Sequence, residues 1–234
     1  MTRTTRRAIP KPPAELGVRD GLAYALFLPP EQPVGAVLIL HGAGSCKESH
    51  YDFARAARGA GMAAVAFDQR GHGESPDQLD QRLLEDIASM AELLPPGPLA
   101  LRGSSMGGYL ALLAAAPLRA RAVVAICPTS AEQLLRGLRS DAFEFRADRP
   151  ALEVFLEAHD LGDTVTGLDT ALLIMHAEGD EQVPVAQSIE LHRAARTPDK
   201  RLIVVPGGHH RSIQHDSELQ AAALRFIARA FKPI

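Results

Sequence analysis

The sequence has few cysteines and little net charge. Its 234 residues include two cysteines, Cys46 and Cys127, which lie far apart and lack the spacing of a metal site. Neither a disulfide framework nor a zinc site is therefore expected, and a reducing compartment fits best. Lys and Arg number 25 against 28 Asp and Glu, a formal net charge of −3. This balance argues against a general nucleic-acid binder, which would carry a basic field.

Long apolar runs are also missing. No stretch approaches the length of a membrane span, and the basic segment 1–13 (MTRTTRRAIPKPP) is not followed by the apolar core of a signal peptide. We therefore expect a cytoplasmic protein with no membrane partner and a solvated N-terminal arm. The chain contains no internal repeat or low-complexity tract. Its length and its 46% hydrophobic content are typical of a single globular domain over 1–234. The oligomeric state stays open.

Short apolar runs alternate with helical patterns along the chain. The segment 21–28, which ends at two prolines, predicts an edge strand. Continuous apolar runs predict strands buried on both faces of a parallel sheet at 35–40, 62–67 and 122–127, and the runs 171–175 and 201–205 predict two further strands. Helical spacing occurs at 51–60, 79–94, 184–195 and 217–231. The alternation predicts an α/β fold with a doubly wound, mostly parallel sheet and helices on both faces.

The interval 128–170 is too long for a simple crossover loop, so it is expected to hold more than one helix and to form a small cap. Its aromatic and aliphatic side chains suit either an acyl pocket or packing onto the sheet.

The stretch 99–116 (LALRGSSMGGYLALLAAA) is typical of a strand, a sharp turn and a helix. It contains the pattern G-x-S-x-G, in which glycines let strand and helix pack closely around a strained serine. Ser105 is then the candidate nucleophile. Ser104 would need a glycine two positions earlier, where Arg102 stands. The alternative interpretation is a helix N-cap serine after a flexible turn.

Ligands of open parallel sheets bind beyond the carboxyl ends of the strands, and these ends supply a serine, then an acid, then a histidine. That chain order is the order of an acyl-transfer triad. Asp180 is the candidate acid, with Gly179 permitting the turn that aims it inward, and Glu178 and Glu181 are its competitors. A histidine of the pair His209–His210 would act as the base, because imidazole ionises near neutrality.

Five motifs together resemble the α/β-hydrolase superfamily, in its small serine esterase, dienelactone-hydrolase-like and serine-peptidase-like branches. They are HGAG at 41–44, DQRGHGES at 68–75, GSSMGG at 103–108, HAEGDEQVP at 176–184 and PGGHH at 206–210. The resemblance implies His210 rather than His209 as the base, through the spacing Pro-Gly-x-x-His. The chain departs from dienelactone hydrolases, which carry cysteine where Ser105 stands, and from haloalkane dehalogenases, which carry aspartate there.

Two backbone N–H groups would stabilise the oxyanion. One belongs to Met106, directly after the nucleophile and at the start of a helix; the other, implied by the resemblance, belongs to Ala43. We expect a serine hydrolase that cleaves an ester, thioester or related acyl bond of a small molecule through an acyl-enzyme, without cofactor or metal. The alternatives are a serine peptidase or amidase on the same triad and a non-catalytic, ligand-binding member of the fold.

The remaining histidines suggest no metal site, because none has the spacing H-E-x-x-H. The resemblance implies that His41 and His72 hold the strand-end loops by hydrogen bonding. The isolated histidines are expected to be exposed: His50, His159, His192 and His215. Cys46 lies close to the HGAG loop in sequence, although a small buried thiol is its commoner environment.

Overall fold

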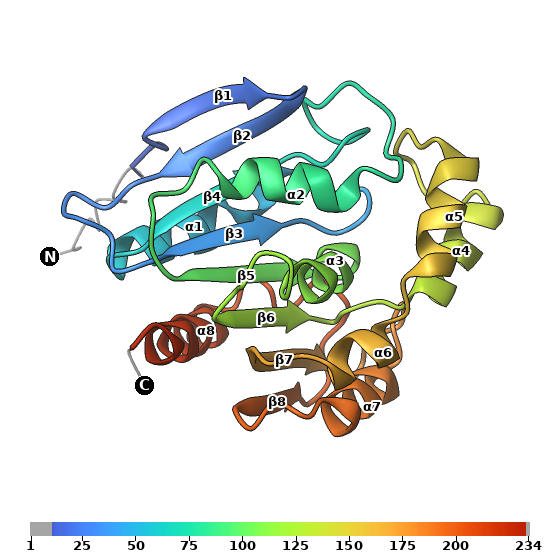
Figure 1. Cartoon of the computed structure of the whole chain (residues 1–234). Coiled ribbons are helices and arrows are strands. Elements are labelled where there is room, and N and C mark those ends of the chain that lie inside the picture. Colours follow the sequence, from blue (N-terminus) through green and yellow to red (C-terminus); the bar gives the residue numbers. More distant parts are fainter. Residues whose placement is uncertain (1–10, 233–234) are drawn as a thin grey trace, which may run out of the picture.

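One eight-stranded sheet forms the centre of the computed structural model, which describes residues 11–232 (Figure 1). Most of the predicted basic arm therefore lies outside the described residues. The strands are β1 (Glu15–Arg19), β2 (Leu22–Phe27), β3 (Ala36–Leu40), β4 (Ala63–Phe67), β5 (Leu99–Ser104), β6 (Ala122–Ile126), β7 (Ala171–Ala177) and β8 (Lys200–Val205). Their order is β1-β2-β4-β3-β5-β6-β7-β8, and all pairs from β4 to β8 are parallel. The predicted mostly parallel α/β sheet is confirmed.

The prediction of an edge strand at 21–28 is wrong. β2 lies between β1 and β4, pairs antiparallel with both, and is buried along its whole length. The edges are β8 and β1, and the sequence analysis missed β1, whose Leu16 and Val18 are exposed. Asp20 and Gly21 form the two-residue turn between these strands, with φ values of 52° and 80°. Asp-Gly is a strong hairpin signal, because both turn positions need positive φ.

Helices cover both faces of the sheet. The 3₁₀ turn η1 (Lys47–His50) leads into α1 (Tyr51–Gly59), and α1 and α8 (Ser217–Ala230) pack on one face through side chains such as Phe53 and Phe226. The other face carries α2 (Leu83–Ala91), α3 (Met106–Ala114), α6 (Leu161–Thr166) and α7 (Val185–Ala194). The helix α2 is shorter than the predicted 79–94, because Leu79 instead bridges to Ala147. No helix among the described residues is long and apolar enough to cross a membrane.

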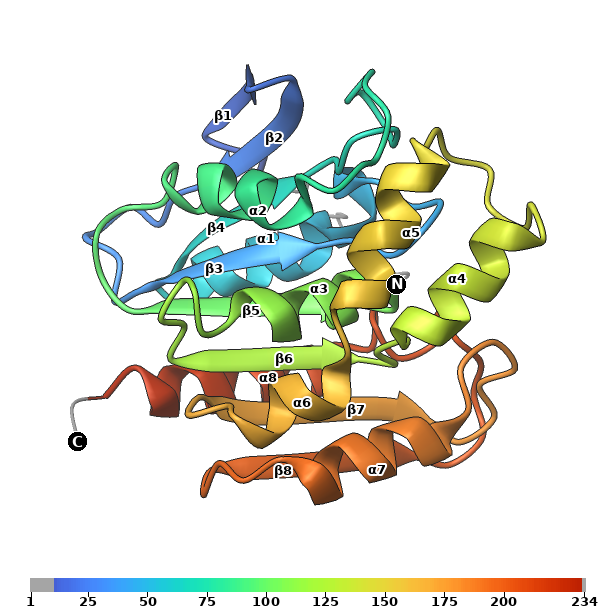
Figure 2. The ribbon, with the colours of Figure 1, turned by 45° about the vertical axis from the view of Figure 1, so that its right-hand side comes forward.

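The interval 128–170 contains three helices: α4 (Ala131–Arg139), α5 (Arg149–Ala158) and α6. Helices α4 and α5 stand beyond the carboxyl ends of the strands (Figure 2). A capping box between Ser130 and Gln133 begins α4, and the Asp148 side chain caps α5. Backbone bonds join this insertion to the loop after β4: Leu79 N donates to Arg146 O, and Asp148 N donates to Leu79 O. That it works as a cap over the site stays a prediction.

A buried ion pair joins the loop after β3 to the loop after β4. The Lys47 ammonium lies 2.8 Å from Asp68 Oδ2 and 2.6 Å from Glu74 Oε2, and the Lys47 and Asp68 side chains are almost fully buried. The Lys47 amide donates to Asp68 Oδ1 at 2.7 Å. Burial opposes the charge on Lys47, but its hydrogen bonds to carboxylates outweigh this and raise its pKa.

His41 makes a second connection between the same two loops. Its Nδ1 donates to the Gly42 carbonyl at 2.8 Å, and its Nε2 accepts from the Gln69 amide at 2.9 Å. The ring must be neutral in this arrangement, because Nε2 acts as an acceptor. Burial, together with the neighbouring His72, lowers the pKa of His41 to about 3. His41 and His72 hold strand-end loops as expected, since His72 Nδ1 donates to the Arg70 carbonyl.

The Lys47–Asp68 pair should stabilise the fold through what its loss would leave behind. In Lys47→Met the buried Asp68 carboxyl group loses its cation partner, so we expect the free energy of unfolding to fall by about 3–5 kcal/mol. Denaturation by urea measures the change. Arg139→Ala is the control, because its bonds to Glu153 and Glu157 are exposed and such pairs contribute about 1 kcal/mol or less. Equal, small losses in both variants would contradict the prediction.

His41 should make the fold sensitive to acid. Below about pH 6.5 the unfolded imidazole binds a proton while the folded one stays neutral down to about pH 3. The unfolded state thus binds more protons, so the free energy of unfolding decreases as the pH falls through this window. His41 contributes up to about 1.4 kcal/mol of this decrease per pH unit. In His41→Gln the loss between pH 7 and pH 5, measured by denaturation, should be smaller. An unaltered dependence in His41→Gln would refute the assignment.

Candidate active site

Ser105 occupies the sharp turn between β5 and α3. Its φ of 53° and ψ of −119° place a residue with a side chain in a region that costs about 1–3 kcal/mol. Its amide donates to Ile126 O at 2.9 Å, and its carbonyl accepts from Tyr109 N in the first turn of α3. Ser104, by contrast, is an ordinary strand residue paired with Ile126. The strain therefore falls on Ser105 alone, with the geometry that turns a side chain outward from the end of a strand.

The two glycines of the G-x-S-x-G pattern are explained by close backbone contacts. A Cβ on Gly103 would overlap the carbonyl of Gly107, and a Cβ on Gly107 would overlap Leu40 O and lie 2.6 Å from His41 O. Neither position can hold a side chain while α3 keeps this approach to the end of β3. Close packing, rather than positive φ, is thus the reason for glycine at both positions.

Asp180 and His210 meet beyond the ends of β7 and β8. His210 Nδ1 donates to Asp180 Oδ2 at 2.7 Å, and both side chains are buried. The competitors do not take these places: Glu178 is exposed, Glu181 accepts from the backbone amide of His210 at 3.4 Å, and His209 is exposed. Gly179 acts differently from the expectation, since a Cβ there would lie 2.5 Å from Gly208 O. Close approach of two loops, not a special turn, requires this glycine.

His176 is a site residue to which the sequence analysis assigned no role. Its Nε2 lies 2.9 Å from Val183 O and 3.3 Å from Asp180 Oδ2, and its Nδ1 is 2.6 Å from Ser188 Oγ. The side chain is fully buried. Its position four residues before Asp180, at the end of a buried strand, was the available signal.

The Asp180 carboxylate accepts three hydrogen bonds, and the Nε2–H of His176, which it shares with Val183 O, lies 3.3 Å away. Besides the two imidazoles, the amides of Gln182 and Val183 donate to Oδ1, each at 2.9 Å. Burial alone would raise the pKa of this carboxyl, but the hydrogen bonds from His176, from His210 and from the amides outweigh it and hold the pKa well below the usual range. Asp180 is therefore ionised at neutral pH and can hold His210 in the tautomer with its proton on Nδ1.

The loop after β3 lies against the Ser105 turn. A Cβ on Gly42 would be 3.2 Å from the Ser105 Cβ, which brings the following residue, Ala43, to the same side of the turn. Met106 is the first residue of α3, where the N–H has no acceptor within the helix. Both proposed oxyanion donors therefore lie in segments that border Ser105.

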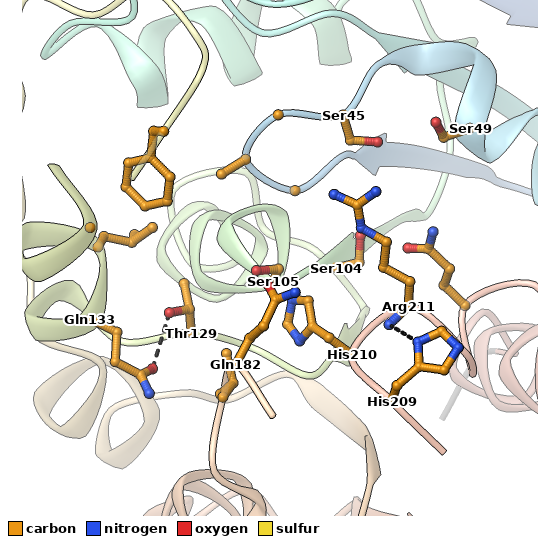
Figure 3. A pocket seen from close by; sticks show the side chains of 18 of the residues that line it. Ser45, Ser49, Ser104, Ser105, Thr129, Gln133, Gln182, His209, His210 and Arg211 are labelled. Atoms are coloured by element: carbon orange, nitrogen blue, oxygen red, sulfur yellow. Dashed lines mark hydrogen bonds between the residues drawn. The ribbon is translucent and has the colours of Figure 1, made fainter. Parts of the chain in front are cut away.

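Ser105 and His210 line one cavity of about 780 Å³. Ala43, Ser104, Thr129 and His209 line it as well. In Figure 3 the His210 ring lies next to the Ser105 side chain, with Gln182 and Thr129 on one side and Arg211 on the other. Ser105 and His210 thus share a cavity that can admit a small molecule, while the buried Asp180 contacts His210 without lining the cavity.

Cys127, Asp180 and His210 form a group whose potential ligand atoms lie within 4.8 Å of one another. The 2.7 Å separation of Asp180 and His210 is that of a hydrogen bond, whereas two ligands of one tetrahedral zinc lie roughly 3.4 Å apart. Burial also raises the pKa of the Cys127 thiol, which keeps it protonated. The donor set therefore suits hydrogen bonding better than metal binding. Both cysteines are free, and Cys46 does not line the cavity.

The expectation that four isolated histidines are exposed is wrong for His50. It is buried, with Nδ1 3.1 Å from Arg102 Nη1, and burial beside that cation lowers its pKa. His159, stacked on Phe155, and His192 are half-buried, whereas His215 is exposed and bonds to a carboxylate. An isolated position in the sequence did not reveal contacts with segments far along the chain.

Comparisons with known proteins agree with this architecture. An uncharacterized protein of Mycobacterium tuberculosis is 26% identical over 202 residues, covering 81% of this chain and 68% of its own length. Human monoglyceride lipase is 31% identical over 97 residues, or 38% of this chain and 32% of the lipase.

Solved structures give the same fold at low sequence identity. The monoacylglycerol lipase of Paleococcus ferrophilus superposes with a TM-score of 0.74 at 20% identity, over 89% of this chain and 99% of the lipase. Est1E of Butyrivibrio proteoclasticus, bound to ferulic acid, superposes with a TM-score of 0.73 at 21% identity, over 92% of this chain and 97% of Est1E. The family model described as the alpha/beta hydrolase fold matches residues 35–172, more than half of the sequence. This chain therefore belongs to the α/β-hydrolase fold family.

Proposed function

We propose that the protein is a serine hydrolase that cleaves an ester, thioester or related acyl bond of a small molecule. The observation that carries the proposal is the 2.7 Å hydrogen bond from His210 to the buried Asp180, because His210 lines the same cavity as Ser105 on its strained turn. Family membership and the similarity to Est1E, to a monoacylglycerol lipase and to human monoglyceride lipase support it.

The reaction has two halves. His210 removes the proton of the Ser105 hydroxyl as Oγ attacks the acyl carbon, and the same proton goes to the departing alcohol or thiol. Water then attacks the acyl-enzyme and gives its proton to His210, so that the acid is released and Ser105 regains its hydrogen. Asp180 stabilises the imidazolium between these steps. The amides of Met106 and Ala43 donate to the developing oxyanion, and no cofactor takes part.

A fluorophosphonate probe should label Ser105, because such probes react with activated serines. We expect one added mass, located by peptide mapping on the peptide that contains Ser104 and Ser105. Ser105→Ala should lose the label, while the matched variant Ser104→Ala should keep it. A label that persists in Ser105→Ala would overturn the assignment of the nucleophile.

His210 and Asp180 should act as a unit. We expect His210→Gln and Asp180→Asn each to lower kcat on a 4-nitrophenyl ester about 10³-fold or more, with the double variant hardly worse than either single one. Circular dichroism should show that the variants remain folded. His209→Gln is the matched variant and should cost far less, because His209 has no bond to Asp180. If instead His209→Gln abolishes turnover and His210→Gln does not, the base has been placed on the wrong histidine.

A further inference from the structure

We propose that the cavity contains an anion subsite at Arg211, and that the substrate is an ester carrying a carboxylate a few bonds from the scissile carbonyl. The inference rests on the proposed function and names its substrate class. Arg211 directly follows His210 and lines the same cavity. In Figure 3 its guanidinium extends from the His210 segment in the direction of Ser45.

The loop that carries Arg211 has its backbone held by short-range hydrogen bonds. Ser212 Oγ accepts from the His209 amide at 3.0 Å and donates to the His209 carbonyl at 2.7 Å. The amide of Arg211 donates to His209 Nδ1 at 3.4 Å, and the amide of Ser212 donates to His209 O at 2.9 Å. The same turn that holds His210 against Asp180 therefore sets where the Arg211 side chain leaves the backbone.

The guanidinium of Arg211 has no acid to neutralise it. Within residues 11–232 no carboxylate forms an ion pair with Arg211, whereas Lys47 is surrounded by three. Among the described residues that line the cavity the one acid is Glu144, which belongs to the exposed segment between α4 and α5. The His210 side of the cavity thus carries a cation without a partner.

The neighbouring side chains suit a carboxylate. Ser45 and Ser49, in the loop and turn after β3, line the cavity and can donate hydroxyl hydrogen bonds, while the guanidinium offers a planar pair of N–H donors. Arg211 is adjacent in sequence to the proposed base and lines the same cavity as Ser105, so an anion bound there would share that cavity with the reacting bond. Such a site would favour a charged ester over a neutral ester of the same shape.

Two matched pairs of esters test the subsite. Mono-4-nitrophenyl glutarate and 4-nitrophenyl valerate share the acyl length and differ in a terminal carboxylate. The 4-carboxyphenyl and 4-(methoxycarbonyl)phenyl esters of valeric acid place the charge on the alcohol instead. We expect the wild-type protein to have the higher kcat/KM for the anionic member of at least one pair, after subtraction of the uncatalysed rate. The pair in which the anionic ester is preferred tells whether the acyl side or the alcohol side of the scissile bond faces Arg211.

Arg211→Gln should reduce that preference about tenfold, while kcat/KM for the neutral ester changes little, and Arg211→Lys should retain part of it. Higher salt should weaken the preference in the wild type. Arg229→Gln is the control, because it removes a positive charge from α8, far along the chain and outside the cavity lining. A preference that is absent in the wild type, or equal in Arg211→Gln and the wild type, would overturn the subsite.

A binding measurement separates this proposal from the proposed function. Calorimetry with monomethyl glutarate on Ser105→Ala should show binding that weakens about tenfold in the double variant Ser105→Ala/Arg211→Gln. Binding that depends on Arg211 without turnover of any ester would support the subsite and overturn the hydrolase proposal. Turnover of neutral esters, together with binding and turnover that do not depend on Arg211, would support the hydrolase proposal and overturn the subsite.

Discussion

The close contact of α3 with the end of β3 is the constraint on which the site depends. Gly103 and Gly107 let the helix and the strands approach until any side chain there would overlap backbone. The turn between them must then take positive φ, which strains Ser105 but points its side chain and the first amide of α3 into one space. The wholly buried α3 offsets the cost, because every residue from Met106 to Ala114 packs inside the protein.

The polar groups around this turn are held by partners from other loops. Asp180 accepts three hydrogen bonds and has His176 at 3.3 Å, so it remains a carboxylate and keeps the Nδ1 proton of His210, which leaves Nε2 on the opposite side of the ring. His41 is held neutral between Gly42 and Gln69, which keeps the HGAG loop at the end of β3. Preorganised groups of this kind need little rearrangement when charge develops in a transition state.

Aromatic contacts connect this arrangement to the insertion. The rings of His41 and His72 lie 4.9 Å apart, His72 stacks on Phe145 at 4.3 Å, and Phe145 stacks on Phe143 at 5.1 Å. Phe143 in turn lines the cavity. The loop that would stabilise the oxyanion is thus in contact, through a row of four rings, with the insertion that would contact the substrate.

The sequence by itself determined the parts that depend on near neighbours. Periodicity predicted the parallel strands and most helices, and the spacing of Gly103, Ser105 and Gly107 predicted the turn, because one local backbone path requires all three. Tertiary structure decided which residues from distant segments meet: β2 in the interior of the sheet, His50 buried beside Arg102, and Asp180 bonded to His210 rather than to its neighbour. These outcomes depend on strand order and on loop approach across the sheet edge, and a local pattern carries no information about either.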